Sequence, residues 1–148
     1  MVGVLNLLDH RHTQAKNLLD ALNLAQVKLI YFDCVIAESL STILRRLHEK
    51  SQTTAISQLI NEIAANFPPE LLTWILPDAP LLYGQILRLI EISSGELNFN
   101  DALIALACRE RHIPYLASFD ADFDAIAWLQ RIERHDELPA AIHKFHPD

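Results

Sequence analysis

The pattern of hydrophobic and polar positions alternates along this chain between the period of a helix and that of a strand. Apolar residues spaced three and four apart are typical of amphipathic helices. They predict helices over residues 13–25, 34–49, 53–66, 77–95 and 100–112. Between these helices stand apolar runs of strand length, over residues 27–32, 71–76 and 113–118. We expect a turn with a short helix over residues 120–129 and an edge strand within residues 130–139.

Short strands that alternate with helices of this length favour an α/β fold with a mainly parallel sheet. The 148 residues, of which 51% are hydrophobic, suit one domain over 1–148, with a C-terminal tail over about 136–148. Two lone cysteines, without a disulfide framework, favour a reducing compartment. Neither a signal peptide nor a run long enough to cross a membrane is predicted, so we expect a cytoplasmic protein.

A net charge of −7 argues against a sequence-independent nucleic-acid coat, which would be basic. It does not exclude a nuclease, because a local basic patch and a bound metal ion can offset the acids of its site. We expect Arg45, Arg46 and Arg109 to contact nucleic acid, although exposed arginines are usually just solvated.

Three carboxylates stand where the predicted strands end or where helices begin near those ends. Glu38 follows the strand over residues 27–32, Asp101 heads the apolar helix, and Asp120 follows the strand over residues 113–118. In open parallel sheets, ligands bind outside the carboxyl ends of the strands. Each acid also has a structural interpretation: a helix cap for Asp101, a solvated face or an ion pair with Arg45 for Glu38, and a turn for Asp120.

Taken together, the three acids predict a cation site, because clustered carboxylates repel one another unless a cation offsets them. Oxygen-only ligands suit Mg²⁺ or Mn²⁺. A calcium loop starting at Asp120 is rejected, because Ala125 and Arg131 stand where the loop needs glycine and glutamate. The histidines lack zinc-ligand spacing, and no glycine-rich phosphate loop is present.

The segments YFDCVIAESLSTILRRL, LNFNDALIALA and SFDADFD, with the helix HTQAKNLLDAL, resemble the PIN domain of VapBC-type toxin ribonucleases. The resemblance implies a three-layer α/β domain, with a mainly parallel sheet of four to five short strands flanked by helices. It also implies Mg²⁺- or Mn²⁺-dependent endonucleolytic cleavage of RNA, a cognate antitoxin protein and a homodimer.

By the same resemblance, Glu38, Asp101 and Asp120 are the catalytic, metal-binding acids, with Ser118 as the hydroxyl partner of Asp120. Asp122 is a further candidate metal ligand and Asp124 a supporting residue, and we expect one of these two to cap the short helix.

The family pattern opens with a strand that ends in an aspartate, and we expect that strand before Met1 or lost from this member. A less favoured interpretation makes residues 2–8 the strand and Asp9 the acid. Without the first acid, we expect a weak or inactive nuclease. The alternatives are a non-catalytic PIN-like module that binds nucleic acid or protein, and a different α/β module such as a phosphate-binding receiver.

Overall fold

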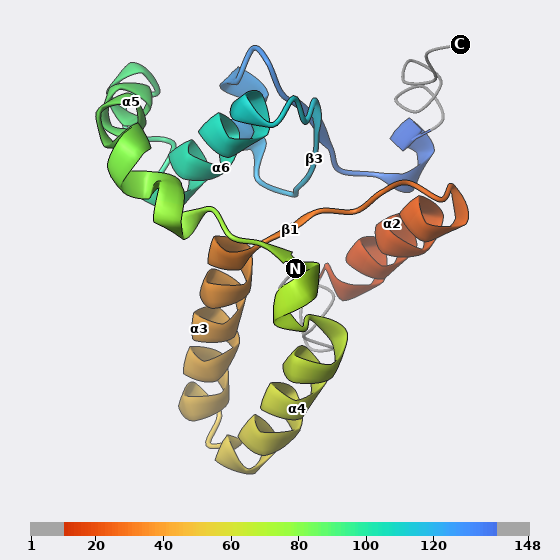
Figure 1. Ribbon diagram of the computed structural model, residues 1–148. Coiled ribbons are helices and arrows are strands. Elements are labelled where there is room, and N and C mark those ends of the chain that lie inside the picture. The colour runs from red at the N-terminus through yellow and green to blue at the C-terminus, as the bar shows by residue number, and fades with distance from the viewer. Residues whose placement is uncertain (1–10, 139–148) are drawn as a thin grey trace. The chain divides into compact units, whose positions relative to one another are not determined.

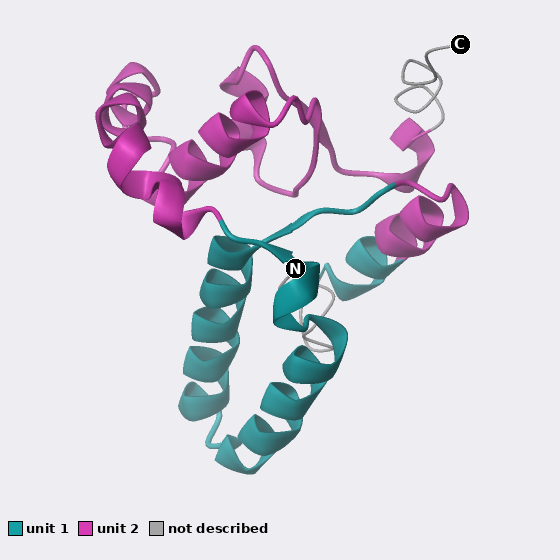
Figure 2. Ribbon diagram, in the orientation of Figure 1, with its two compact units in different colours: residues 1–16, 28–74 teal, residues 17–27, 75–148 magenta. Residues whose placement is uncertain are grey.

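The computed structural model describes residues 11–138, and the chain divides into two compact units (Figure 2). The described part of unit 1 comprises residues 11–16 and 28–74, and that of unit 2 comprises residues 17–27 and 75–138. One of the three boundaries between them falls within α2 (His12–Leu24), which buries Ala15, Leu18 and Leu22. These three residues recur at helical spacing, as the sequence pattern requires.

Unit 1 combines a parallel strand pair with two successive helices (Figure 1). Strand β1 (Tyr31–Phe32) pairs with β2 (Leu72–Thr73), with Tyr31 opposite Leu72. Between the strands the chain forms α3 (Asp33–Glu49), the 3₁₀ turn η1 (Thr53–Ala55), α4 (Ile56–Asn66) and the 3₁₀ turn η2 (Pro69–Leu71). Buried side chains of the strand pair and the two helices include Phe32, Cys34, Ile43 and Leu59.

Unit 2 combines a helix pair with a second parallel strand pair (Figure 1). Helix α5 (Ala79–Ile92) packs against α6 (Phe99–Glu110). Strand β3 (Tyr115–Ala117) pairs with β4 (Gln130–Ile132), with Leu116 opposite Arg131. Three 3₁₀ turns complete the described part: η3 (Leu76–Asp78), η4 (Ala121–Ala125) and η5 (His135–Glu137).

Helix α6 is the most deeply buried element of unit 2. Eight consecutive residues, from Asp101 to Cys108, are buried. A helix that is apolar nearly all round can only be accommodated in this way, because no face of it is suited to water. The burial of α6 is thus a consequence of its apolar sequence.

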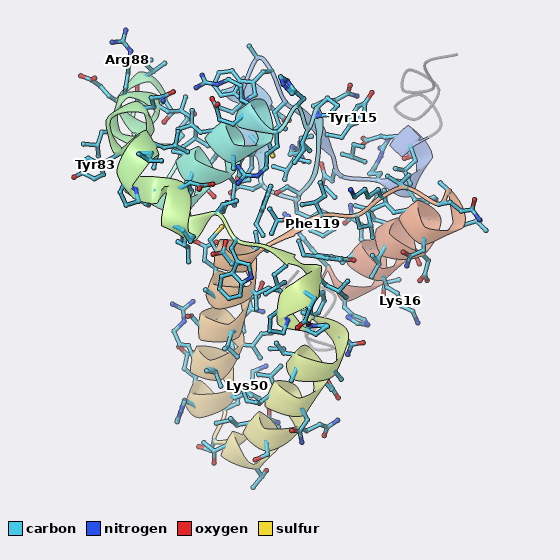
Figure 3. The ribbon with its side chains drawn as sticks, viewed as in Figure 1. Lys16, Lys50, Tyr83, Arg88, Tyr115 and Phe119 are labelled. Carbon is cyan, nitrogen blue, oxygen red and sulfur yellow. The ribbon has the colours of Figure 1, made fainter. Side chains whose placement is uncertain are left out.

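Helix α5 is buried on one side only. Ile86 is fully buried, whereas Leu81 is 86% exposed. Tyr83 and Arg88 are exposed on the same helix, where Figure 3 shows their side chains pointing outward. After the helix ends, Gly95 has a φ of 82°, and its N–H donates to the carbonyl oxygen of Ile90 at 2.9 Å. A left-handed backbone of this kind is where glycine commonly stands after a helix.

The α/β fold class with parallel strands is confirmed, and the predicted helices agree with the structure to within a few residues. The strands are shorter than predicted, and in residues 11–138 they form two parallel pairs, one in each unit. The predicted single domain and its tail stay predictions, and residues 139–148 lie outside the described part. Within that part, no helix is both long enough and apolar enough to cross a membrane.

Candidate metal site and its acidic turn

The acidic turn that follows β3 is organised by Asp120. Its side chain accepts a hydrogen bond at 3.0 Å from the backbone N–H of Asp122, which makes Asp120 the N-cap of η4. The N–H of Asp120 donates to Ser118 Oγ at 3.1 Å. We expected Asp122 or Asp124 to cap this short helix, and that prediction is wrong. The N-cap is the residue just before the first turn, where Asp120 lies, whereas Asp122 and Asp124 lie within η4.

The other end of the turn is fixed by an ion pair. Arg131 Nε and Nη2 donate to the two carboxylate oxygens of Asp124, both at 2.8 Å. Hydrogen bonds from Arg131 lower the pKa of Asp124, and those to Asp124 and Glu133 raise the pKa of Arg131. Phe123, 4% exposed, anchors the turn in the core between these polar contacts.

Asp101 lies at the start of α6 within a capping box. The Asn98 side chain accepts from the N–H groups of Asn100 and Asp101, at 2.8 and 3.0 Å. Asp101 Oδ2 in turn accepts from the N–H of Asn98 at 3.0 Å. The capping interpretation of Asp101 is therefore confirmed. The same bond fixes the orientation of a carboxylate that is only 7% exposed.

Glu38 lies in α3, exposed, one helical turn beyond the buried Cys34. Burial, together with the neighbouring negative charges of Asp33 and Glu38, raises the pKa of the Cys34 thiol to about 12. The predicted ion pair of Glu38 with Arg45 is not formed, because Arg45 makes no ion pair within residues 11–138. Seven residues of helix separate the two along the axis by about 10 Å.

Asp33 is a buried acid that is not among the acids predicted from the sequence. It is 5% exposed and is the first residue of α3, so the helix begins one residue earlier than predicted and Phe32 takes the N-cap position. The available signal was its place directly after an apolar strand, the same signal that identified Asp120. Asp33 therefore joins the candidate acids.

The candidate acids are divided between the two units. Glu38 and Asp33 belong to unit 1, whereas Asp101 and the turn of Asp120 belong to unit 2. Within unit 2, residues 111–114 connect α6 to β3 (Figure 1). The predicted common pocket stays a prediction.

No group of three or more histidine, cysteine, aspartate or glutamate side chains suited to a metal ion occurs within residues 11–138. Asp9, the less favoured candidate for a first acid, lies outside the described residues.

The arginines predicted to contact nucleic acid differ in their surroundings. Arg45 is exposed on α3, and Arg46 lies one residue further along the same helix. The Arg109 guanidinium lies 5.0 Å from the centre of the Trp128 ring and donates to Gln85. It also pairs with Glu110 at 3.5 Å. Arg109 is thus already engaged on three sides, whereas Arg45 keeps its charge open to solvent.

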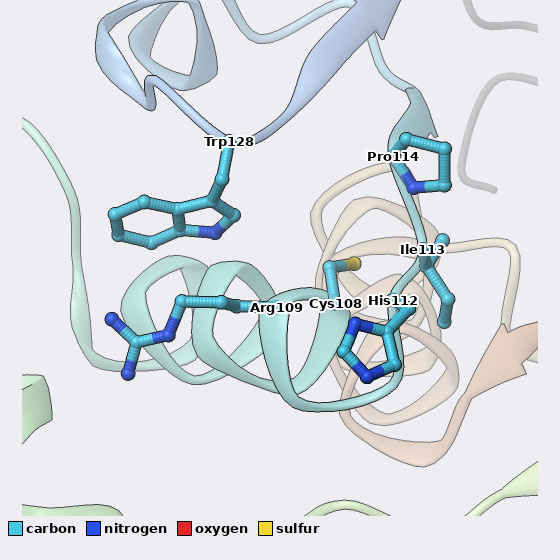
Figure 4. Close-up of a pocket in the computed structure, with 6 residues that line it drawn as sticks. All are labelled: Cys108, Arg109, His112, Ile113, Pro114 and Trp128. Atoms are coloured by element: carbon cyan, nitrogen blue, oxygen red, sulfur yellow. The ribbon is translucent and has the colours of Figure 1, made fainter.

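A pocket of about 300 Å³ lies at the C-terminal end of α6, at the opposite end of this helix from Asp101. Figure 4 shows the Trp128 ring above the helix and the Cys108 sulfur between Trp128 and Pro114. The lining residues are Cys108, Arg109, His112, Ile113, Pro114 and Trp128. Burial raises the pKa of Cys108 to about 11, which keeps the thiol neutral and unreactive near pH 7. No candidate acid lines this pocket.

Comparison with known proteins gives one family. The family model described as PIN domain matches residues 3–129, and so runs through both units. No curated protein and no solved structure matches the chain. The matched range includes Glu38, Asp101 and Asp120.

Proposed function

This chain belongs to the PIN-domain family, and from that premise we propose that it is a Mg²⁺- or Mn²⁺-dependent endoribonuclease of the toxin type, acting in the cytoplasm. PIN domains are generally nuclease-like. The observation that carries the proposal is the placement of acids within the matched range. Asp101 is held at the start of a buried helix, and Asp120 follows strand β3 as the N-cap of η4.

The donor chemistry of these residues fits a small, hard cation. Asp101, Asp120 and Glu38 offer only carboxylate oxygens, which Mg²⁺ and Mn²⁺ prefer over nitrogen and sulfur. Asp101 is oriented by the N–H of Asn98, and Asp120 by the N–H of Asp122. Carboxylates held in this way need little reorganisation to bind a cation, which favours these two acids as ligands.

A divalent cation held by Glu38, Asp101 and Asp120 would lower the pKa of a water molecule and offset the charge of the scissile phosphate. The protein's own part in this scheme is to hold the acids. Asp101 keeps its orientation through the capping box, and Ser118 Oγ, by accepting from the N–H of Asp120, fixes the backbone that carries the next acid. Arg45 and Arg46 would attract the phosphate backbone of RNA.

The experiment that tests the proposal is cleavage of a fluorescently labelled single-stranded RNA. Cleavage should require Mn²⁺ or Mg²⁺, stop with EDTA, and fall by at least tenfold in Glu38→Gln and in Asp120→Asn. Glu49→Gln, a change at an exposed acid at the far end of α3, is the matched control for Glu38→Gln. If the glutamine and asparagine variants at the proposed site cleave as well as the control, the proposed acids are wrong.

A toxin-type enzyme also implies a homodimer and a cognate antitoxin protein. The mass of the purified chain in solution tests the first, since a homodimer has twice the 16.8 kDa of the chain. Growth arrest on expression, relieved by one co-expressed protein, tests the second. A monomer would contradict the homodimer proposal, and expression without growth arrest would contradict the toxin proposal. Neither result would alter the nuclease proposal.

A further inference from the structure

A single arginine holds both ends of the turn that carries Asp120. At the start of the turn, Arg131 Nη1 donates to the carbonyl oxygen of Ser118 at 3.2 Å. At its end, Arg131 Nε and Nη2 bind the two carboxylate oxygens of Asp124, both at 2.8 Å. Asp120 and Asp122 lie between these two points. The conformation of the acidic turn is thus tied to one side chain of β4.

Arg131 is itself rigidly held. It lies in the parallel pair of β3 and β4, opposite Leu116, and its side chain is only 12% exposed. Nη1 also bonds Glu133 Oε2 at 3.0 Å. A planar guanidinium can bind one carboxylate with two parallel bonds while its third nitrogen bonds elsewhere, whereas a lysine ammonium offers one point of charge. The observed contacts therefore require arginine.

These contacts divide the local acids into two groups. Arg131 binds Asp124 and Glu133, and both oxygens of Asp124 are taken. No ion pair involves Asp120 or Asp122 within residues 11–138. Asp120 and Asp122 thus remain available for an external cation, and Asp124 does not.

We propose that Arg131 is a positioning residue of the metal site: it fixes residues 118–124 so that Asp120 is oriented toward a divalent cation that Arg131 itself does not touch. The inference rests on the proposed function, because it requires that Asp120 binds a metal ion. It assigns Asp124 a role in holding the turn, in place of a role as a ligand.

The proposal can be tested by the direction in which substitutions of Arg131 change the affinity for the metal ion. If Arg131 acted on the cation only through its charge, Arg131→Met would tighten metal binding, because a positive charge near the site repels the cation. If it positions Asp120, the same change weakens binding, because the turn loses both anchors. Arg131→Lys keeps the charge and loses the two-bond geometry, so a charge effect predicts no change there and positioning predicts a loss.

The experiment is calorimetric titration of the full chain with Mn²⁺, for the wild type, Arg131→Lys, Arg131→Met, Asp124→Asn and the double variant Arg131→Met/Asp124→Asn. Arg134→Met is the matched control, because the Arg134 side chain is 60% exposed and, among the residues that the structure describes, forms ion pairs only with Asp136 and Glu137, outside the turn. Far-UV circular dichroism verifies folding, and Arg131→Lys carries the test if Arg131→Met does not fold.

We expect both Arg131 variants to raise the Mn²⁺ dissociation constant by roughly tenfold or more, the usual effect of losing a group that orients a metal ligand. The double variant should be no weaker than Arg131→Met alone, and Arg134→Met should bind within about twofold of the wild type. Unchanged or tighter binding by the Arg131 variants overturns the positioning role alone. A wild type that binds no Mn²⁺ overturns the proposed function, and this inference with it.

Discussion

The capping box at the start of α6 allows the structural and the functional roles of Asp101 to be separated by two substitutions. Asn98→Ala removes the side chain that accepts from Asn100 and Asp101, but keeps the backbone N–H that orients the Asp101 carboxylate. Asp101→Asn keeps an oxygen that can accept from that N–H but removes the negative charge. If Asp101 binds a metal ion, the first change affects mainly stability and the second mainly metal binding.

The magnitudes follow from the contacts. Losing an N-cap lowers the free energy of unfolding by about 1 kcal/mol, within a range of roughly 0.5–2 kcal/mol. Asp101→Asn loses only the charge–dipole attraction at the helix start, about 0.3–1 kcal/mol. Relief of repulsion from other carboxylates would reduce that loss, because like charges held close together destabilise one another. Metal-free Asp101→Asn should therefore be at least as stable as Asn98→Ala.

The assay is urea unfolding followed by circular dichroism, with and without Mn²⁺. At about 100 times its dissociation constant, a ligand that binds only the folded state adds roughly 3 kcal/mol to the free energy of unfolding. The wild type and Asn98→Ala should both show this gain, and Asp101→Asn should lose most of it. If Asp101→Asn keeps the full gain, Asp101 is a helix cap and no ligand.

Three further predictions concern the packing and backbone of unit 2. Ile86→Ala, at a fully buried position, should lower the free energy of unfolding by about 2–5 kcal/mol. Leu81→Ala, at a position 86% exposed, should change it by at most about 0.5 kcal/mol, and the urea midpoints of the two variants test this difference. Gly84→Ala should raise the melting temperature, because Gly84 is helical and a methyl group there meets no other atom. Gly95→Ala should lower the melting temperature, because the φ of Gly95 is 82°. Equal shifts in the two variants would contradict the backbone argument. The pKa of Cys108 is raised to about 11 in the folded protein, so the folded thiol stays neutral at a pH where the unfolded thiol ionises. The contribution of this thiol to the free energy of unfolding is therefore fully present below about pH 9 and is lost between about pH 9 and 11. Urea titrations between pH 9 and 11 should show the free energy of unfolding of the wild type falling by up to roughly 3 kcal/mol relative to that of Cys108→Ala. If the free energies of unfolding of the two proteins change with pH in parallel, the argument is refuted.

Local signals predicted α6 and its surroundings well. The apolar run from Ala102 to Cys108 has no polar face, so burial is the only stable outcome. Gly95 marks the end of α5, because only a residue without a side chain adopts a φ of 82° readily. Asp101 was recognised both as a cap and as a candidate ligand, since both roles favour an acid at a helix start.

Features that depend on the pairing of distant residues were missed. The bonds of Arg131 to Asp124 and Ser118 depend on the parallel register of β3 and β4, and nothing local to Arg131 indicates that register. The strands are shorter than predicted because a strand is defined by backbone pairing with a distant segment, which an apolar run does not indicate. Strand β1 therefore contains only Tyr31 and Phe32 of its predicted six residues. The burial of Asp33, which is 5% exposed, is likewise not indicated by its neighbours in the sequence.

The most direct test of the proposed nuclease is a single-turnover cleavage assay, with the full chain in excess over a labelled single-stranded RNA so that slow cleavage is still seen. The wild type should cleave the RNA with Mn²⁺ or Mg²⁺ and stop with EDTA, and the triple variant Glu38→Gln/Asp101→Asn/Asp120→Asn should be inactive while keeping the circular dichroism spectrum of the wild type. Cleavage by a folded triple variant at the wild-type rate, or cleavage that persists in EDTA, would contradict metal-dependent catalysis by these acids.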